Sequence, residues 1–463
     1  MPVVMRTCGT LAVILLLTIC AITPRAMAQD THYWTYTYGT RASLLNGAII
    51  GSVVDISAAY YNPGALPLIE EIEVLLAARA VHYPNIWLRN IGGSDLDLKS
   101  SRLAPAPSIV AGMFKLNWAG DHRFGYSLLT RQSARLEIKG SWVGTRDSVP
   151  DFPDAESATA DAVIDEDLSE TWVGISWGYG LSSDIGIGIT QYATFRYHKA
   201  TFQSRLQNLK DDGSLALTSS LKYYDYANWR MLWKLGATFH YANISMGLTI
   251  TTPSIKFYDE GASGVNVTAT GVDFDGDDVD DTVMGVDYAN DIESDYRTPA
   301  SLGFGATYLF GATTVHFSTE WFNRVKKYTV MNAGDFPAQS GGDTLSNRVT
   351  HELDQVINFG IGLEHSFRET FQIYGGFATD YSARKEGTDT NLSITDWDIY
   401  SISGGAAFSY KRFQVTFGLG YSWGGSPRSR KSVVDPGSGE GTGFVEGAEF
   451  EYKNIKALLG FAF

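Results

Sequence analysis

An acidic stretch in the second half of the chain holds the densest group of potential metal ligands. Its carboxylates follow the spacing i, i+2, i+4, i+7 and i+8, at Asp273, Asp275, Asp277, Asp280 and Asp281. Ca²⁺ binds roughly six to eight oxygen ligands and suits carboxylates crowded on a turn. The stretch departs from an EF-hand, because Gly276 stands in the fourth place and no Glu closes the loop. We predict a Ca²⁺ site in an outer loop; the alternative is a solvated acidic loop without metal.

A second group of candidate residues alternates with apolar residues along predicted strands. The cations of this group are Arg131, Arg196 and Lys234, and the aromatic side chains Tyr192 and Phe322 fall on the same side. A half-buried cation can hold a carboxylate by charge-assisted hydrogen bonds, while the aromatics line an apolar path. We predict that these five residues bind a ligand. The alternative is that the cations pair with inward acids to hold the wall, the available partners being Glu320, Glu364 and Asp380.

No arrangement of residues typical of an enzyme stands out. The sequence contains no Gly-x-Ser-x-Gly and no His-Glu-x-x-His motif, and its eight His residues are scattered. Both cysteines, Cys8 and Cys20, lie in the segment assigned below to a signal peptide. We therefore expect no enzymatic activity, and no cofactor apart from the predicted Ca²⁺.

The elements that would position these residues are strands with one apolar face. The last strand, Ile455 to Phe463, places Ile455, Ala457, Leu459, Phe461 and Phe463 on one side and small or mixed residues on the other. The same period of two returns in Phe413 to Trp423 and in Asp184 to Tyr197. Only 19% of the residues are charged, yet no segment beyond the N-terminus approaches 18 consecutive apolar residues. This pattern predicts a transmembrane antiparallel β-barrel.

The number and spacing of such segments favour a barrel over a soluble β-sandwich. Fourteen segments alternate in this way, at 70–83, 100–116, 122–138, 170–181, 184–207, 228–241, 243–257, 296–310, 312–330, 350–366, 369–384, 394–410, 412–425 and 445–463. Short links alternate with long ones, the long ones at 84–99, 139–169, 208–227, 258–295, 331–349, 385–393 and 426–444. Short periplasmic turns and long outer loops are typical of outer-membrane barrels.

The N-terminus predicts export. Arg6, an apolar core from Leu11 to Ile22 and the small residues Ala26 and Ala28 form a secretory signal peptide over residues 1–28. Without it the chain has 34 basic and 51 acidic residues, which argues against a nucleic-acid partner. We expect the mature chain in the bacterial outer membrane, surrounded by its lipid and lipopolysaccharide, as a monomer.

A stretch after the signal peptide resembles a known family. Asp55-Ile-Ser-Ala-Ala-Tyr-Tyr-Asn-Pro-Gly-Ala-Leu66 resembles the N-terminal plug of the FadL/TodX family of outer-membrane transporters for hydrophobic compounds, with Gly64-Ala65 in the reverse of the usual order. Pro107 to Phe114, Asn228 to Ala237, Thr298 to Tyr308 and Asn358 to His365 resemble strand openings of that family.

The resemblance implies a plug over residues 29–68 and a barrel over residues 69–463. It also implies passive uptake of a long-chain fatty acid or another hydrophobic small molecule, released when the plug shifts. The residues matching the motif, Asp55, Asn62, Pro63 and Gly64, are then the expected gating residues. Two alternatives remain: a non-transport surface or adhesion barrel with calcium-ordered loops, and a general diffusion porin.

Overall fold

The computed structural model of the chain describes residues 31–69, 74–89, 98–101, 104–114, 116, 120–146, 156–209, 213–272, 279–340, 344–368, 370–384, 397–410, 413–426 and 449–462. The signal peptide predicted at residues 1–28 lies outside these ranges. In the described part of the chain, no helix is both long and apolar enough to cross a membrane.

Strands dominate the described residues. In chain order they are β1 (Val74–Arg89), β2 (Leu98–Ser101), β3 (Ala104–Phe114), β4 (His122–Arg146), β5 (Glu156–Gly180), β6 (Ile185–Leu209), β7 (Leu215–Tyr241), β8 (Ile244–Thr251), β9 (Ile255–Val272), β10 (Asp281–Ile292), β11 (Ser301–Phe310), β12 (Thr313–Phe322), β13 (Val325–Pro337), β14 (Thr344–Leu353), β15 (Val356–Arg368), β16 (Phe371–Asp380), β17 (Ile399–Tyr410), β18 (Phe413–Ser426) and β19 (Glu449–Ala462). The helices are short and precede them: α2 (Thr40–Leu44), α3 (Ala58–Tyr61) and the 3₁₀ helix η1 (Pro63–Leu68).

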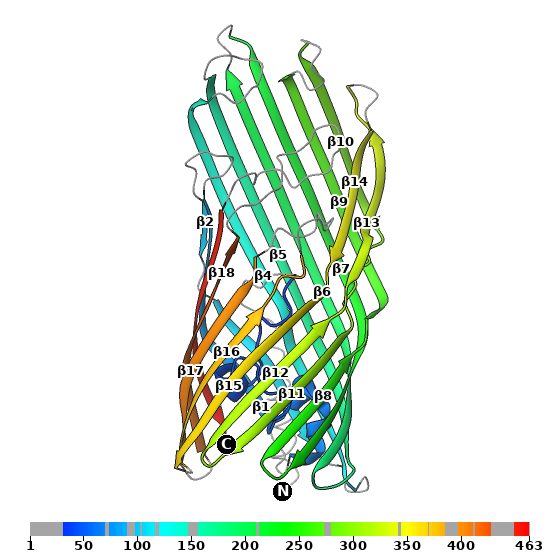
Figure 1. Cartoon of the computed structure of the whole chain (residues 1–463). Coiled ribbons are helices and arrows are strands. Elements are labelled where there is room, and N and C mark those ends of the chain that lie inside the picture. Colours follow the sequence, from blue (N-terminus) through cyan, green and yellow to red (C-terminus); the bar gives the residue numbers. More distant parts are fainter. Residues whose placement is uncertain are drawn as a thin grey trace, which may run out of the picture.

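Fourteen of these strands form the barrel wall, which confirms the predicted fold class and strand number. Antiparallel pairing runs through β1, β3, β4, β5, β6, β7, β8, β11, β12, β15, β16, β17, β18 and β19, and β19 pairs again with β1. The wall encloses the short helices (Figure 1). Two-residue turns at Ala242 and Gly311 close hairpins at its lower rim, with the positive φ that such turns need.

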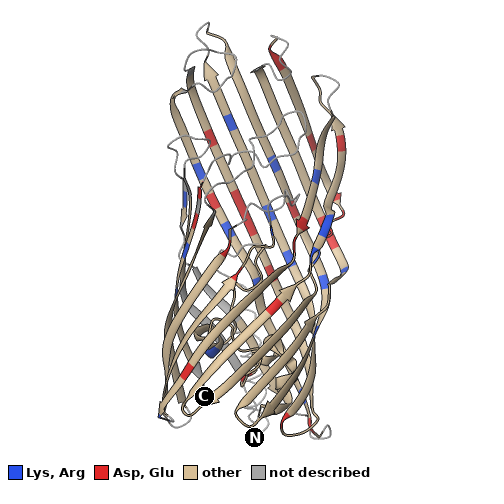
Figure 2. Ribbon diagram, in the orientation of Figure 1, with Lys and Arg blue, Asp and Glu red and all other residues tan. Residues whose placement is uncertain are grey.

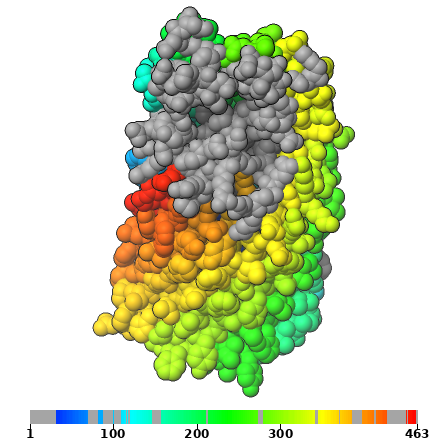
Figure 3. Space-filling view, turned by 45° about the horizontal axis from the view of Figure 1, so that its top comes forward, coloured from blue at the N-terminus to red at the C-terminus, as the bar shows by residue number. Residues whose placement is uncertain are grey.

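The lower half of the wall carries apolar side chains outward. Ile187, Leu248 and Phe417 are 36%, 53% and 48% exposed, whereas the intervening side chains point inward and are mostly buried. Figure 3 shows this lower wall as a continuous surface of side chains. The Lys, Arg, Asp and Glu residues gather mainly in the upper half (Figure 2). An apolar band about 25 Å tall below a polar region is the expected surface of a barrel in a bilayer.

Above this band the strands continue much further than the sequence predicted. β4 to β7 have 25 to 27 residues, or roughly 80 Å of strand, far more than a bilayer requires. The predicted loops 139–169, 208–227, 258–295 and 331–349 are therefore largely wrong, because β4, β5, β7, β9, β10, β13 and β14 occupy much of them. The acidic run 151–170 forms strand from Glu156 onward. Its outward Asp161, Asp165 and Asp167 alternate with buried Ala162, Ile164 and Leu168. Because the outward side chains are acidic here, the segment lacks the apolar outer face by which the strands were predicted.

Residues 31–69, here called the plug segment, fill the lower lumen. Leu44, Leu45, Ile49, Ile56 and Leu66 are almost completely buried in one cluster with inward residues of the wall. The backbone of the plug segment lies directly against wall glycines. A Cβ added at Gly305 would meet the backbone of Gly51, and one added at Gly188 would meet the carbonyl of Pro63. The small inward face of the strands thus leaves the room that the plug segment occupies.

Candidate functional site

Buried acids of the wall fasten the first residues of the plug segment. One oxygen of Asp380 accepts hydrogen bonds from the backbone N–H groups of Tyr33 (3.0 Å) and Trp34 (2.9 Å), and the other accepts from the Thr35 hydroxyl (2.6 Å). Arg41 of α2 donates to Glu364 of β15 at 2.9 Å. The third inward acid of the sequence analysis, Glu320, accepts a hydrogen bond from the Trp34 indole at 2.9 Å, so all three acids hold the plug segment.

The predicted gating residues lie at the end of the plug segment that contacts β6 and β7. Asn62 is fully buried; its amide nitrogen donates to the carbonyls of Ile50 and Ala237, and its oxygen accepts from the backbone of Gly64. A Cβ on Gly64 would lie 2.7 Å from the Cα of Ala237, so this position excludes larger residues. The Pro63 carbonyl faces a wall glycine. Asp55 instead makes a local turn, accepting from the backbone N–H of Ser57.

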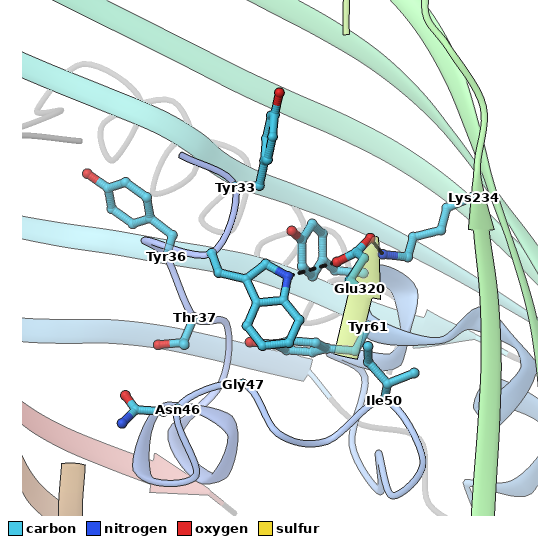
Figure 4. Close-up of a pocket in the computed structure, with 11 residues that line it drawn as sticks. Tyr33, Tyr36, Thr37, Asn46, Gly47, Ile50, Tyr61, Lys234 and Glu320 are labelled. Atoms are coloured by element: carbon cyan, nitrogen blue, oxygen red, sulfur yellow. Dashed lines mark hydrogen bonds and ion pairs between the residues drawn. The ribbon is translucent and has the colours of Figure 1, made fainter. Parts of the chain in front are cut away.

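A narrow cavity lies between the plug segment and the inner face of β4, β5, β7, β8, β11 and β12. Its two adjoining parts share Tyr33, Tyr60, Lys234 and Glu320. The further lining residues are Trp34, Tyr36, Thr37, Asn46, Gly47, Ile50, Tyr61, Arg131, Trp172, Thr251, Thr298, Pro299, Ser301 and Phe322. Figure 4 shows the part beside the plug segment, where Lys234 and Glu320 approach aromatic side chains. The free space is about 20 Å³ in each part, enough for roughly one water molecule, so a larger ligand fits only if part of the lining moves.

Arg131 brings to this cavity a buried charge that the carboxylates of Glu170 and Glu320 balance only at longer range. Its side chain is 7% exposed, and the guanidinium lies 5.4 Å from the centre of the Trp172 ring. Among the described residues it has neither a hydrogen bond nor an ion pair within 4.0 Å. Burial raises the pKa of the neighbouring Tyr60 to about 12, against the opposing effect of Arg131, so this phenol stays neutral and does not balance the charge. A buried cation without a partner is costly and commonly marks a binding site.

Lys234 is the second buried cation of the cavity, and its pairing is weak. The Nζ atom lies 3.9 Å from Oε1 of Glu320, beyond hydrogen-bond distance, and 4.8 Å from the centre of the Tyr60 ring. Glu320 is held by other groups: Ser301 donates to Oε1 at 2.6 Å and the Trp34 indole donates to Oε2 at 2.9 Å. The dashed line that ends on Glu320 in Figure 4 marks this indole bond. Two cations thus face one carboxylate, which favours an anionic group in the cavity.

The other predicted ligand-binding residues have different surroundings. Arg196 does not line the cavity; it pairs with Glu170 at 2.7 Å and also donates to Gln132 and Tyr226. Tyr192 is fully buried, and its hydroxyl donates to the Ala59 carbonyl of the plug segment. Phe322 lines the cavity and stacks on Tyr33 with ring centres 4.2 Å apart. The structure therefore brings Arg131, Lys234 and Phe322 together and places Arg196 and Tyr192 elsewhere.

The wall itself is irregular at Arg131. In the described residues the pairing of β3 with β4 runs from the pair Ile109 and Leu129 to the pair Phe114 and Phe124. The register of β4 with β5 shifts at Arg131. Such a bulge redirects side chains. Directly beyond the last β3 pair, the plug segment provides the partners: the hydroxyls of Tyr38 and Tyr36 donate to the carbonyls of Thr130 (2.9 Å) and Ser133 (3.0 Å).

The predicted Ca²⁺ ligands fall mostly outside the described residues. Asp273, Asp275 and Asp277 lie there, whereas Asp280 precedes β10 and Asp281 begins it. Within the described ranges no group of three or more His, Cys, Asp or Glu side chains is placed to hold a metal ion. The Ca²⁺ site stays a prediction.

Sequence reasoning missed the contribution of the plug segment to the cavity. Tyr33, Trp34 and Tyr60 come from it, and none was predicted to bind a ligand. The available signal was composition, since residues 33–38 and 60–61 contain six aromatic side chains.

Solved structures share this fold across almost the whole chain. The Pseudomonas aeruginosa FadL homologue superimposes with a TM-score of 0.58 at 15% identity, covering 93% of this chain and 99% of its own. The Pseudomonas putida toluene transporter TodX gives 0.57 at 13%, covering 92% and 99%, and the Ralstonia pickettii toluene transporter TbuX gives 0.54 at 13%, covering 92% and 98%. The predicted resemblance to the FadL/TodX family is therefore confirmed in the fold. The sequence matches no protein-family model and none of the curated proteins with which it was compared.

Proposed function

We propose that this chain is an outer-membrane transporter that takes up an anionic hydrophobic molecule, of which a long-chain fatty acid is the simplest example. The observation that carries the proposal is the buried guanidinium of Arg131, which faces an aromatic cavity without an anionic partner. A carboxylate head group bound between Arg131 and Lys234 would supply that partner. The alkyl or aryl body would then contact Tyr33, Trp172 and Phe322.

The charge of the cavity separates this proposal from transport of a neutral hydrocarbon. Two of the similar structures are described as toluene transporters, and toluene carries no charge. Burying a cation is unfavourable unless it is paired, so a site for neutral molecules gains nothing from two cations and one carboxylate. Apart from these cations, the cavity lining would suit either kind of cargo.

Binding in nonionic detergent tests the choice of cargo. We expect purified barrel to bind oleate much more tightly than oleyl alcohol, which has the same chain and no charge, and more tightly than toluene. Equal binding of oleate and oleyl alcohol would contradict the anionic site. Preferential binding of toluene would indicate a hydrocarbon channel.

Vesicle assays test transport itself. Proteoliposomes containing the intact chain should take up labelled oleate, and deletion of Asp30 to Leu66 or closure of the lumen should change the rate. An unchanged rate would favour the surface or adhesion barrel. Because the plug segment fills the lower lumen, intact chain should conduct small ions poorly in planar bilayers, whereas high conductance would favour a porin. We further propose a monomer surrounded by lipopolysaccharide, which native mass spectrometry can test.

A further inference from the structure

The hydrogen bond between Trp34 and Glu320 joins the plug segment to the cargo cavity. Trp34 belongs to the plug segment, and Glu320 lies near the end of β12, where it is 6% exposed. Among the described residues that line the cavity, Glu320 is the only acid. The same carboxylate therefore contacts the element that must move and faces the cations that would hold the cargo.

Glu320 occupies the position of an internal anion in the empty cavity. It lies 3.9 Å from Lys234, close enough for attraction but too far for a hydrogen bond. A carboxylate entering between Arg131 and Lys234 would take over this attraction and would also repel Glu320 across a short distance of low polarity. Both effects weaken the electrostatic hold on Glu320 in its present position.

We propose that Glu320 is an internal competitor of the cargo head group, and that displacing it from Lys234 loosens its hydrogen bond to Trp34 and so frees the first part of the plug segment. The inference rests on the proposed anionic cargo. While the plug segment is in place, the cavity is too small for cargo. Cargo binding would itself make room, because it weakens the Trp34–Glu320 contact that holds the plug segment beside the cavity. By linkage, the factor by which cargo weakens the Trp34 contact equals the factor by which that contact weakens cargo binding.

Substitution of Trp34 provides the direct test. Trp34→Phe keeps an aromatic ring and removes the indole donor. We expect the variant to bind oleate several-fold more tightly than the wild type, because binding no longer has to break the Trp34–Glu320 bond. Trp177→Phe is the matched control, since it removes an indole hydrogen bond (to His122, 3.0 Å) at the outer surface of the wall. It should leave oleate affinity unchanged.

Thiol labelling reports movement of the plug segment independently of affinity. The only cysteines, Cys8 and Cys20, lie within the predicted signal peptide, so Thr37→Cys would give the mature chain a single thiol in the plug segment. We expect saturating oleate to speed its reaction with a bulky polar maleimide several-fold, and oleyl alcohol to leave it unchanged. With Trp34→Phe the rate should already be high without oleate.

Glu320→Gln separates charge from hydrogen bonding and serves if the Trp34 variant does not fold. The amide oxygen can still accept from Trp34, but the competing charge is gone. Oleate affinity should rise several-fold, and the increase in labelling caused by oleate should shrink. Unchanged oleate affinity in both variants, or labelling that ignores oleate, would overturn the inference. Failure of the wild type to bind oleate at all would instead refute the proposed function.

Discussion

Replacing Arg131 with Met removes the charge on which the proposed cargo site depends and keeps a flexible side chain. A carboxylate about 4 Å from the guanidinium gains about 4 kcal/mol at an effective dielectric constant of about 20. Desolvation of the carboxylate offsets part of this gain, leaving about 2–3 kcal/mol. We therefore expect Arg131→Met to weaken oleate binding by about 30- to 150-fold and to change oleyl alcohol binding by less than about 3-fold.

The same substitution should not destabilise the barrel. Among the described residues Arg131 has no ion pair or hydrogen bond to lose, and removing an unpaired buried charge is neutral or stabilising. Arg196→Met is the matched control. It breaks the 2.7 Å pair with Glu170 and leaves a buried carboxylate without its cation, which costs about 3–5 kcal/mol.

Displacement of a fluorescent fatty acid in nonionic detergent measures the binding, and thermal unfolding of the same samples measures the stability. The two variants should show opposite patterns: Arg131→Met loses oleate affinity and keeps its melting temperature, whereas Arg196→Met loses melting temperature first. Arg131→Met with wild-type oleate affinity would refute the assignment of the head-group site.

Three further predictions concern the plug segment and the acidic loop. Asp380→Asn should weaken the hydrogen bonds to Tyr33, Trp34 and Thr35, worth about 1.5–3 kcal/mol each while the acceptor is charged, and should speed proteolysis within the plug segment. Gly64→Val should force the plug segment away from Ala237 and raise ion conductance in planar bilayers, whereas Gly375→Val, whose nearest non-neighbouring atom is 3.9 Å from the added Cβ, should not. Ca²⁺ should protect the loop around residues 273–281 from proteolysis, and chelation should remove the protection.

Each of these outcomes has a clear opposite. Wild-type proteolysis of Asp380→Asn would show that this acid does not hold the plug segment. Unchanged conductance of Gly64→Val would show that the contact with β7 yields without displacing the plug segment. Equal cleavage of the acidic loop with Ca²⁺ and with chelator would leave it as a solvated loop.

The barrel could be predicted from the sequence because its two faces differ chemically at every second residue. Phe417 and Ile187 alternate with glycines, and both are exposed on the outer face of the wall. The predicted strands ended too early, because beyond the bilayer the outward face of a strand is no longer apolar. Along β5 the outward side chains become Asp161, Asp165 and Asp167, so the apolar residues between them no longer stood out as one face.

The site was harder to predict because it depends on distances across the lumen. Alternation places Arg131, Arg196 and Lys234 on the inner side, but it does not reveal which cation meets an acid. Arg196 meets Glu170 on the neighbouring strand β5, whereas Lys234 and Glu320 approach from β7 and β12. The role of Trp34 depends on where the plug segment sits, which no periodic pattern records.

The glycines that receive the plug segment have a consequence for permeability. Where the wall has no side chains, nothing but the plug segment itself narrows the bore. A barrel that expelled this segment would therefore present a wide aqueous hole, through which salts, sugars and antibiotics would pass regardless of charge or size below its diameter. Any opening that keeps the barrel impermeable to such solutes must therefore displace only part of the plug segment.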